Sequence, residues 1–342
     1  MRVLFYGGCH AAALARVFKR NCKSLEHVDH LTNFQLIRSG EPVPYEYIGS
    51  FERVVFSPIR NKREYKTIHL ENFLRARGIH FFKYPWLQWE GYFPGTARSP
   101  YSWYTGWWPA SLERLAEECT SKDAFLDEIY AGNALRELVA PNFERTTQRL
   151  EQGEKDCDIA ISSIILSSYR DKRLLLTNDH AGIELYKPIA EEVARWLNCR
   201  LDPAFHHSTT EVQLGIQCPV LPSVIDELGI RFPGGDFTNK MMIGADVLSI
   251  SEYASLAWDA KSIHLAIAAT DTRVYFSAPQ PQLRPIPIKR GEMFLVRDRR
   301  SERIGPYHQY ELIAVRKGSG RIDRQSCPGD FLLYRPHWNG LR

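Results

Sequence analysis

The chain opens on a short apolar run that stops at two glycines and then becomes helical. Val3-Leu4-Phe5-Tyr6 leads into Gly7-Gly8-Cys9-His10, and an alanine-rich stretch follows from Ala11 to Arg20. This order predicts a buried strand, a tight turn and a helix. The first N–H groups of such a helix are free to stabilise negative charge beside the turn. The turn therefore suits chemistry, although a cysteine that only packs against the sheet explains the same residues.

The same alternation of strand and helix continues along the chain. We expect strands over 53–56 and 79–84 with a helix over 68–76 between them, which is the rhythm of a parallel α/β sheet. The hydrophobic spacing then predicts an added helical layer, with helices over 121–132, 134–152 and 158–169. A strand over 173–177 follows, and then two more helices, from 186 or 188 to 197 and over 223–228. A further helix start is expected over 249–258.

The composition changes after about residue 260. Short β-type runs divided by proline and glycine predict a small antiparallel region, with strands over 263–268, 273–276, 292–296, 310–315 and 331–334. We therefore expect an α/β domain over 1–260 and a β-rich C-terminal region over 261–342.

Charge and cysteine content narrow the classes of protein. Lys and Arg total 44 against 40 Asp and Glu, a net charge of +4, which is too small to indicate a nucleic-acid surface. The longest apolar runs, such as 159–166, are too short to cross a bilayer, and the N-terminus lacks the pattern of an export signal. The seven cysteines are scattered without a CxxC pair, and His206-His207 lack companion ligands. We expect a cytoplasmic protein with reduced thiols, no metal site and no membrane span.

A second polar segment, Thr177-Asn178-Asp179-His180, follows a predicted strand. Because parallel strands end at one edge of a sheet, we expect this segment to share a cleft with Cys9. His180 is the candidate general base, oriented by Asn178 or Asp179. Simple capping of the next helix by Asn178 or Asp179 is the alternative.

The roles of Cys9 and His10 stay open at this point. A helix N-terminus favours a thiolate, so Cys9 could be a nucleophile, or it could line the pocket that a substrate thiol enters. His10 either contacts substrate or faces solvent in the first turn of the helix, and we favour solvent.

Two further segments suggest ligand contacts. Four cations, Arg60, Lys62, Arg63 and Lys66, lie in the segment that precedes the helix over 68–76. They could bind phosphate, or they could form a solvated loop. Residues 86–108 are rich in Trp and Tyr, whose rings could pack on sugar or adenine or could form a small hydrophobic core.

Taken together, these motifs resemble the WcbI-type polysaccharide biosynthesis family. The resemblance rests on 5–10, 56–60, 84–94 and 176–180, continues in 220–224, 228–230 and 248–253, and covers about residues 1–258. It implies a cytoplasmic bacterial enzyme of capsule or exopolysaccharide assembly that binds coenzyme A and O-acetylates a sugar. The family's usual Gly-Asn-Cys-Gln is replaced around Cys9, and its usual Asn-His-Pro is replaced by Asn178-Asp179-His180-Ala181.

The resulting hypothesis is an acetyl-CoA-dependent O-acetyltransferase whose acceptor is a sugar nucleotide, a lipid-linked sugar or a growing polysaccharide. Cys9, Asn178, Asp179 and His180 are the predicted catalytic residues. The predicted coenzyme A contacts are Gly8, His10, Arg60, Lys62, Arg63 and Tyr65, and the predicted substrate contacts are Trp89 and Tyr92. The alternatives are an SGNH-like esterase that uses Cys9 and His180, and a non-catalytic carbohydrate-binding subunit of a polysaccharide assembly complex. The oligomeric state is not predicted.

Overall fold

The computed structural model describes residues 1–96, 112, 115–116, 118–213, 216–235, 237–239, 247–251, 254, 258 and the strands of the C-terminal region. The chain divides into two compact units. One unit comprises Met1–Tyr92, Ala140–Leu214 and Leu228–Phe232, and the other comprises Phe93–Val139, Gly215–Glu227 and Pro233–Arg342.

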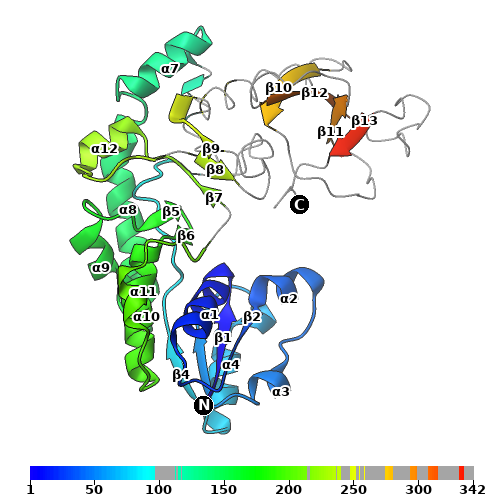
Figure 1. Cartoon of the computed structure of the whole chain (residues 1–342), viewed down its shortest axis with the longest axis vertical. Coiled ribbons are helices and arrows are strands. Elements are labelled where there is room, and N and C mark those ends of the chain that lie inside the picture. The colour runs from blue at the N-terminus through cyan, green and yellow to red at the C-terminus, as the bar shows by residue number, and fades with distance from the viewer. Residues whose placement is uncertain are drawn as a thin grey trace. The chain divides into compact units, whose positions relative to one another are not determined.

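The first unit is built on a four-stranded parallel sheet (Figure 1). Its strands are β1 (Arg2–Gly7), β2 (His27–Thr32), β3 (Arg53–Phe56) and β4 (His80–Lys83), in the order β2-β1-β3-β4. In register, Val3 lies opposite Val28 on one side and Arg53 on the other. The predicted parallel α/β fold is confirmed.

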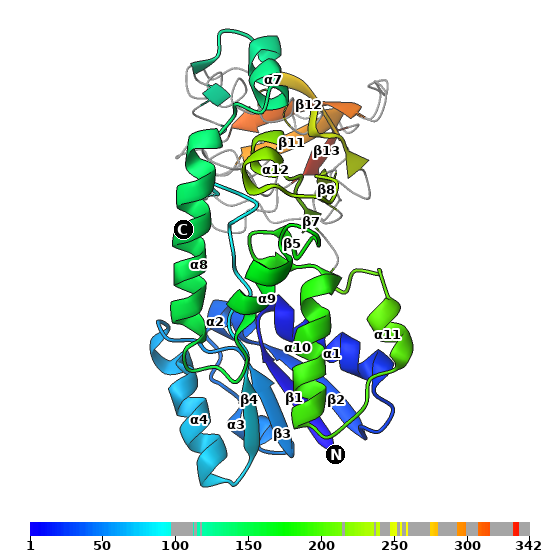
Figure 2. The ribbon, with the colours of Figure 1, turned by 90° about the vertical axis from the view of Figure 1, so that its left-hand side faces the viewer.

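Helices cover both faces of this sheet, which explains why its central strands are almost continuously apolar. Leu4 and Tyr6 face a buried cluster that includes residues of α2 (Asn33–Ser39), α3 (Tyr45–Ile48) and α4 (Thr67–Ala76). Phe5 packs on Phe18 of α1 (Cys9–Asn21), with 5.3 Å between ring centroids. Phe82 of β4 packs on Trp196 of α10 (Ile183–Trp196). Figure 2 shows α4 on one side of the strands and α10 on the other.

The order of the strands places a topological switch point between β1 and β3. Helix α1 leads from β1 to β2 at one edge, and the chain then returns past β1 to β3. The connections on either side of β1 diverge, and ligands of open α/β sheets bind in the crevice at the carboxyl ends of such strands. Gly8 and Cys9 follow β1 at that edge, and Ser57 follows β3.

The remaining elements of the first unit follow β3 along the chain. They are η1 (Arg63–Tyr65), α9 (Ile161–Ser168), β5 (Leu175–Thr177), β6 (His180–Ala181) and α11 (Pro203–His207), with most of α8 (Arg136–Glu154). Helices α1 and α10 pack side by side, and α10 also packs on α9 (Figures 1 and 2).

The second unit holds α7 (Lys122–Tyr130) and α12 (Pro222–Leu228), as predicted, and a small antiparallel sheet of β7 (Ile216–Gln217), β8 (Phe237–Asn239) and β9 (Val247–Leu248). An antiparallel sheet in the order β10-β12-β11-β13 follows, made of β10 (Val274–Pro279), β11 (Met293–Asp298), β12 (Tyr307–Ala314) and β13 (Phe331–Tyr334). The strand predicted over 263–268 lies outside the described residues. A domain boundary at 260 stays a prediction.

Among the described residues, none of the helices combines the length and the apolar character that a membrane span requires.

Candidate active site

The turn after β1 is shaped by close packing on both glycines. A Cβ on Gly8 would lie 2.7 Å from Cη2 of Trp86, and a Cβ on Gly7 would lie 3.3 Å from the hydroxyl of Tyr84. Gly8 is the N-cap of α1, in an extended conformation and without a side-chain cap. The first N–H groups of α1 are therefore free of side-chain capping at Cys9, and the positive end of the helix lies there.

His10 is fully buried in the first turn of α1, so the expectation that it faces solvent is wrong. Its Nε2 donates to the backbone carbonyl of Asp179 at 2.6 Å, and its ring meets Trp86 edge-on at 5.2 Å between centroids. Burial lowers the pKa of His10 from 6.5 to about 3. His10 is therefore a neutral side chain that ties α1 to the segment around Asp179.

That second segment is a tight hairpin between β5 and β6 rather than a junction between a strand and a helix. The Thr177 hydroxyl accepts from the backbone N–H of His180 at 3.0 Å and donates to Oδ1 of Asp179 at 3.1 Å. Helix α10 begins only at Ile183, after the hairpin. The sequence-based reason for placing this segment beside Cys9 was therefore wrong, because β5 pairs with β6 and does not belong to the parallel sheet.

The two turns nevertheless meet, through the hydrogen bond from His10 to Asp179. Burial, together with the nearby carboxylate of Asp179, raises the pKa of the Cys9 thiol from 9.0 to about 11, against hydrogen bonds that lower it. Burial also raises the pKa of Asp179, which the charge of His180 opposes. Cys9, Asp179 and His180 thus share one partly buried electrostatic environment, in which the thiol is neutral at pH 7.

A glutamine that the sequence did not suggest completes this environment. Nε2 of Gln213 donates to Sγ of Cys9 at 3.0 Å, while its Oε1 accepts from the hydroxyl of Tyr186 at 2.6 Å and from the backbone N–H of Ala181 at 3.2 Å. Gln213 is 3% exposed. It lies in an irregular segment after α11, with no motif around it.

Several buried polar atoms at this edge have no hydrogen-bond partner among the described residues. They are Nδ1 of His10, Oγ of Ser57, the hydroxyl of Tyr84 and Oδ1 of Asn178. Such atoms usually carry a cost of about 1–3 kcal/mol each, so a group of them beside a thiol indicates a site for a polar ligand.

The comparisons with known proteins identify the family. A family model described as "Polysaccharide biosynthesis enzyme WcbI" matches residues 2–202. The chain belongs to the WcbI family. A solved structure of WcbI, described as a native protein without a disulfide bond between coenzyme A and one of its cysteines, is similar with a TM-score of 0.59 and 18% sequence identity. That similarity covers 78% of this chain and 92% of the other, and no curated protein matches.

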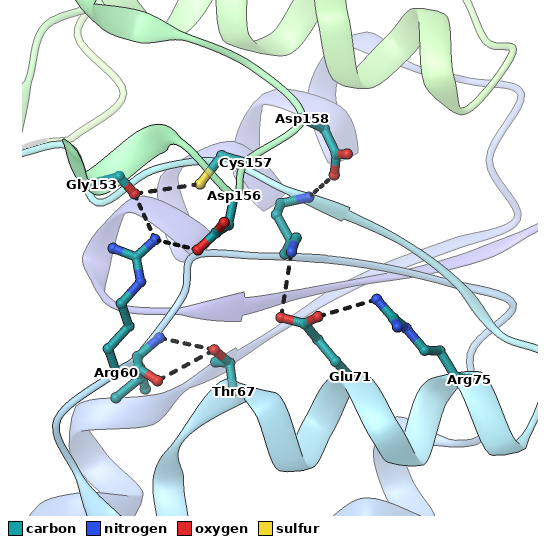
Figure 3. Close-up of polar contacts among 10 residues, drawn as sticks. Arg60, Thr67, Glu71, Arg75, Gly153, Asp156, Cys157 and Asp158 are labelled. Atoms are coloured by element: carbon teal, nitrogen blue, oxygen red, sulfur yellow. Dashed lines mark hydrogen bonds and ion pairs between the residues drawn. The ribbon is translucent and has the colours of Figure 1, made fainter. Parts of the chain in front are cut away.

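Within this WcbI-family fold, the predicted phosphate-binding segment lies after β3. Figure 3 shows the guanidinium of Arg60 directed at the carbonyl of Gly153, at 2.9 Å, and at the carboxylate of Asp156, at 3.4 Å. The Arg60 side chain is half exposed, and Lys62 is exposed. An exposed ion pair of this kind contributes little to stability. Arg63 is the first residue of η1.

Three predicted contact residues are packed inside the unit. The Tyr65 ring belongs to the buried cluster under the sheet, and its hydroxyl donates to the carbonyl of Glu41 at 2.9 Å. Trp89 is fully buried, and its Nε1 donates to Oγ1 of Thr147 at 3.1 Å. Tyr92 is buried and donates to the carbonyl of Tyr169 at 2.7 Å. The contacts of these residues are those of a small hydrophobic core, and their predicted role in ligand binding stays a prediction.

The segment that carries Trp89 is anchored to α8 by a buried carboxylate. Glu90 pairs with Arg145 at 3.0 Å and with Arg149 at 2.8 Å, and the backbone N–H of Trp89 donates to the carbonyl of Asn178 at 2.8 Å. The segment that carries Trp89 therefore links α8 to the hairpin. Its remaining aromatic residues, over 97–108, lie outside the described residues.

Proposed function

We propose that this protein is a cytoplasmic acyltransferase that transfers an acetyl group from acetyl-CoA to a sugar hydroxyl during assembly of a capsule or exopolysaccharide. The observation that carries the proposal is the meeting of Cys9 at the N-terminus of α1 with Asp179 and His180 of the hairpin. Membership of the WcbI family and the coenzyme A named for its solved member support it. The six cysteines of the described part carry free thiols, which agrees with a reducing compartment.

In this proposal His180 is the general base. Acetyl-CoA supplies the acyl group as a thioester. The acceptor oxygen bonds to the thioester carbonyl carbon as its proton passes to His180; the C–S bond breaks, and the proton then returns to the departing sulfur. Asp179 would favour the protonated imidazole, since its charge and that of His180 act on each other. The N–H groups of Gly8 and Cys9 would stabilise the negative charge that develops on the carbonyl oxygen.

The Cys9 thiol is better suited to line the pocket wall than to act as a nucleophile. With a pKa raised to about 11, only a small fraction is thiolate at pH 7. This also argues against the esterase alternative, which needs Cys9 to attack an acyl group.

The residues at the edge of the sheet fit coenzyme A in two ways. The unpartnered hydroxyls of Ser57 and Tyr84 offer hydrogen bonds beside the thiol. Arg60 and Lys62, on the loop after β3, would bind its phosphates, with Arg60 released from its exposed pair with Asp156. The acceptor would be a sugar nucleotide, a lipid-linked sugar or a polysaccharide.

Titration of the thermal stability with coenzyme A tests the proposal. We expect coenzyme A to raise the melting temperature, because a ligand of the native state stabilises it, and Arg60→Ala to weaken this effect. Arg195→Ala is the matched control, since Arg195 also holds an exposed ion pair, with Glu192. Absence of any shift in the wild-type protein would favour the carbohydrate-binding alternative.

The catalytic role of His180 has its own assay. Release of free coenzyme A thiol from acetyl-CoA in the presence of sugar acceptors should fall about 10²–10⁴-fold in His180→Ala. His207→Ala, an exposed histidine of α11, should leave it unchanged. Release of acetate without any acceptor, dependent on Cys9, would contradict the transferase and favour the esterase.

A further inference from the structure

Gln213 reaches the site from a segment that the family match does not cover. The match ends at residue 202, whereas the side-chain donor to Sγ of Cys9 among the described residues is Nε2 of Gln213. Glu211, two residues earlier, accepts from the backbone N–H of Ile183 at 2.6 Å. The segment over 211–213 is thus fixed against the end of the hairpin and the start of α10.

The orientation of the Gln213 amide is determined by its other partners. Oε1 faces two donors, the hydroxyl of Tyr186 and the backbone N–H of Ala181. If the amide were turned over, its NH₂ group would face the N–H of Ala181, which cannot rotate away and cannot accept. The amide nitrogen is therefore the group that faces the sulfur.

The Tyr186 hydroxyl is a permanent donor in this arrangement. Tyr186 is fully buried near the start of α10, and burial raises its pKa well above the ordinary value of 10.0. It therefore keeps its proton at any pH at which the protein functions. The hydrogen bonds therefore run in one direction: the Tyr186 hydroxyl donates to Gln213, and the Gln213 amide donates to Cys9.

The surroundings of the sulfur otherwise disfavour negative charge, because burial and the carboxylate of Asp179 both raise the pKa of the thiol. The groups that oppose them are the N–H groups of Cys9 and His10 and the amide of Gln213. Gln213 is the side chain in this set that can be altered without changing the helix.

We propose that Gln213 is the positioning residue of this site: its amide N–H holds the sulfur of Cys9 in place and stabilises negative charge there. Its consequence for turnover rests on the proposed function, because a displaced Cys9 side chain would slow turnover only if acyl transfer takes place in the pocket that Cys9 lines. The effect on the thiol itself does not depend on any activity.

The test is the pH dependence of Cys9 alkylation by iodoacetamide, followed on the Cys9 peptide by mass spectrometry in the protein without ligand. Gln213→Glu keeps oxygens for Tyr186 and Ala181 but faces the sulfur with a carboxyl oxygen instead of an N–H donor. We expect the midpoint of alkylation to rise by about one pH unit or more in a variant that a cooperative thermal transition shows to be folded. Gln148→Glu, an exposed glutamine of α8, is the matched control and should not move the midpoint.

A second variant keeps the test decisive if Gln213→Glu does not fold. Gln213→Met has nearly the same length and no N–H donor, so the alkylation midpoint should again rise. A wild-type midpoint in a folded variant would overturn the proposal and leave Gln213 as a residue that only satisfies Tyr186 and Ala181. Failure of coenzyme A to bind would overturn the proposed function instead, since the alkylation is measured without it.

Discussion

Ionisation of Glu211 lowers the free energy of unfolding as the pH rises. Burial raises the pKa of Glu211 from 4.5 to about 7, aided by Glu184 and opposed by the N–H of Ile183 and by Arg173. Because the folded state holds this proton more tightly, the stabilising contribution is complete below about pH 4.5 and is lost as the pH rises through about 7. At about 1.4 kcal/mol per pH unit, the shift from 4.5 to about 7 makes the loss at most about 3.5 kcal/mol.

Glu211→Gln isolates this effect. The amide oxygen of the variant can still accept from the N–H of Ile183, but the side chain does not ionise. The free energy of unfolding, measured with urea from pH 5 to 8, should therefore favour the variant over the wild type by an amount that grows with pH toward about 3.5 kcal/mol. Other titrating groups are common to both proteins and cancel in the difference. Glu151→Gln, an exposed residue of α8, is the control. A difference that stays constant from pH 5 to 8 would refute the reasoning.

Three further substitutions probe the packing around the site. Gly8→Ala places a methyl group 2.7 Å from Cη2 of Trp86 and should cost about 1–3 kcal/mol in thermal unfolding, less in a Trp86→Ala background. Tyr84→Phe removes a buried hydroxyl that has no partner in the described part, so the free protein should be equally stable or about 1 kcal/mol more stable, while its affinity for coenzyme A in calorimetry should fall. Glu90→Gln weakens the anchor to two arginines of α8 and should cost about 1–3 kcal/mol in urea unfolding; an unchanged midpoint would show that the anchor is dispensable.

The parts of the fold that the sequence predicted correctly are those whose burial is uniform. β1 and β3 are apolar along their length because helices cover both faces of the sheet. Such runs can be recognised as strands in the sequence without knowing which elements pack against them. β2 was missed because it is an edge strand in which only Val28 is buried, so neither an apolar run nor an alternation marks it. The start of α10 was placed too late because Pro188 suggested a first turn, whereas it lies inside the helix.

The candidate site was partly predictable for a different reason. Cys9 is fixed by local geometry, since a strand, two glycines and a helix determine where it lies. Gln213 could not be found in this way, because its contact with Cys9 joins residues 204 positions apart and no pattern surrounds it. The burial of His10 is indicated by the residues around it. Ala11, Ala13 and Ala15 flank it with small side chains, which allow a helix to be enclosed on several sides, and α1 is enclosed between the sheet and α10.

His10 also explains how a short hairpin outside the parallel sheet is held at the sheet's edge. The β5–β6 pairing supplies few hydrogen bonds of its own, and a two-stranded hairpin is only marginally stable. The bond from Nε2 of His10 to the carbonyl of Asp179 links it to the first turn of α1, and the neutral ring donates this bond as the tautomer protonated at Nε2. Protonation of His10 is therefore not needed for the site to assemble. In the proposed mechanism the histidine that exchanges protons with the substrate is His180, and the bond from His10 holds its neighbour Asp179.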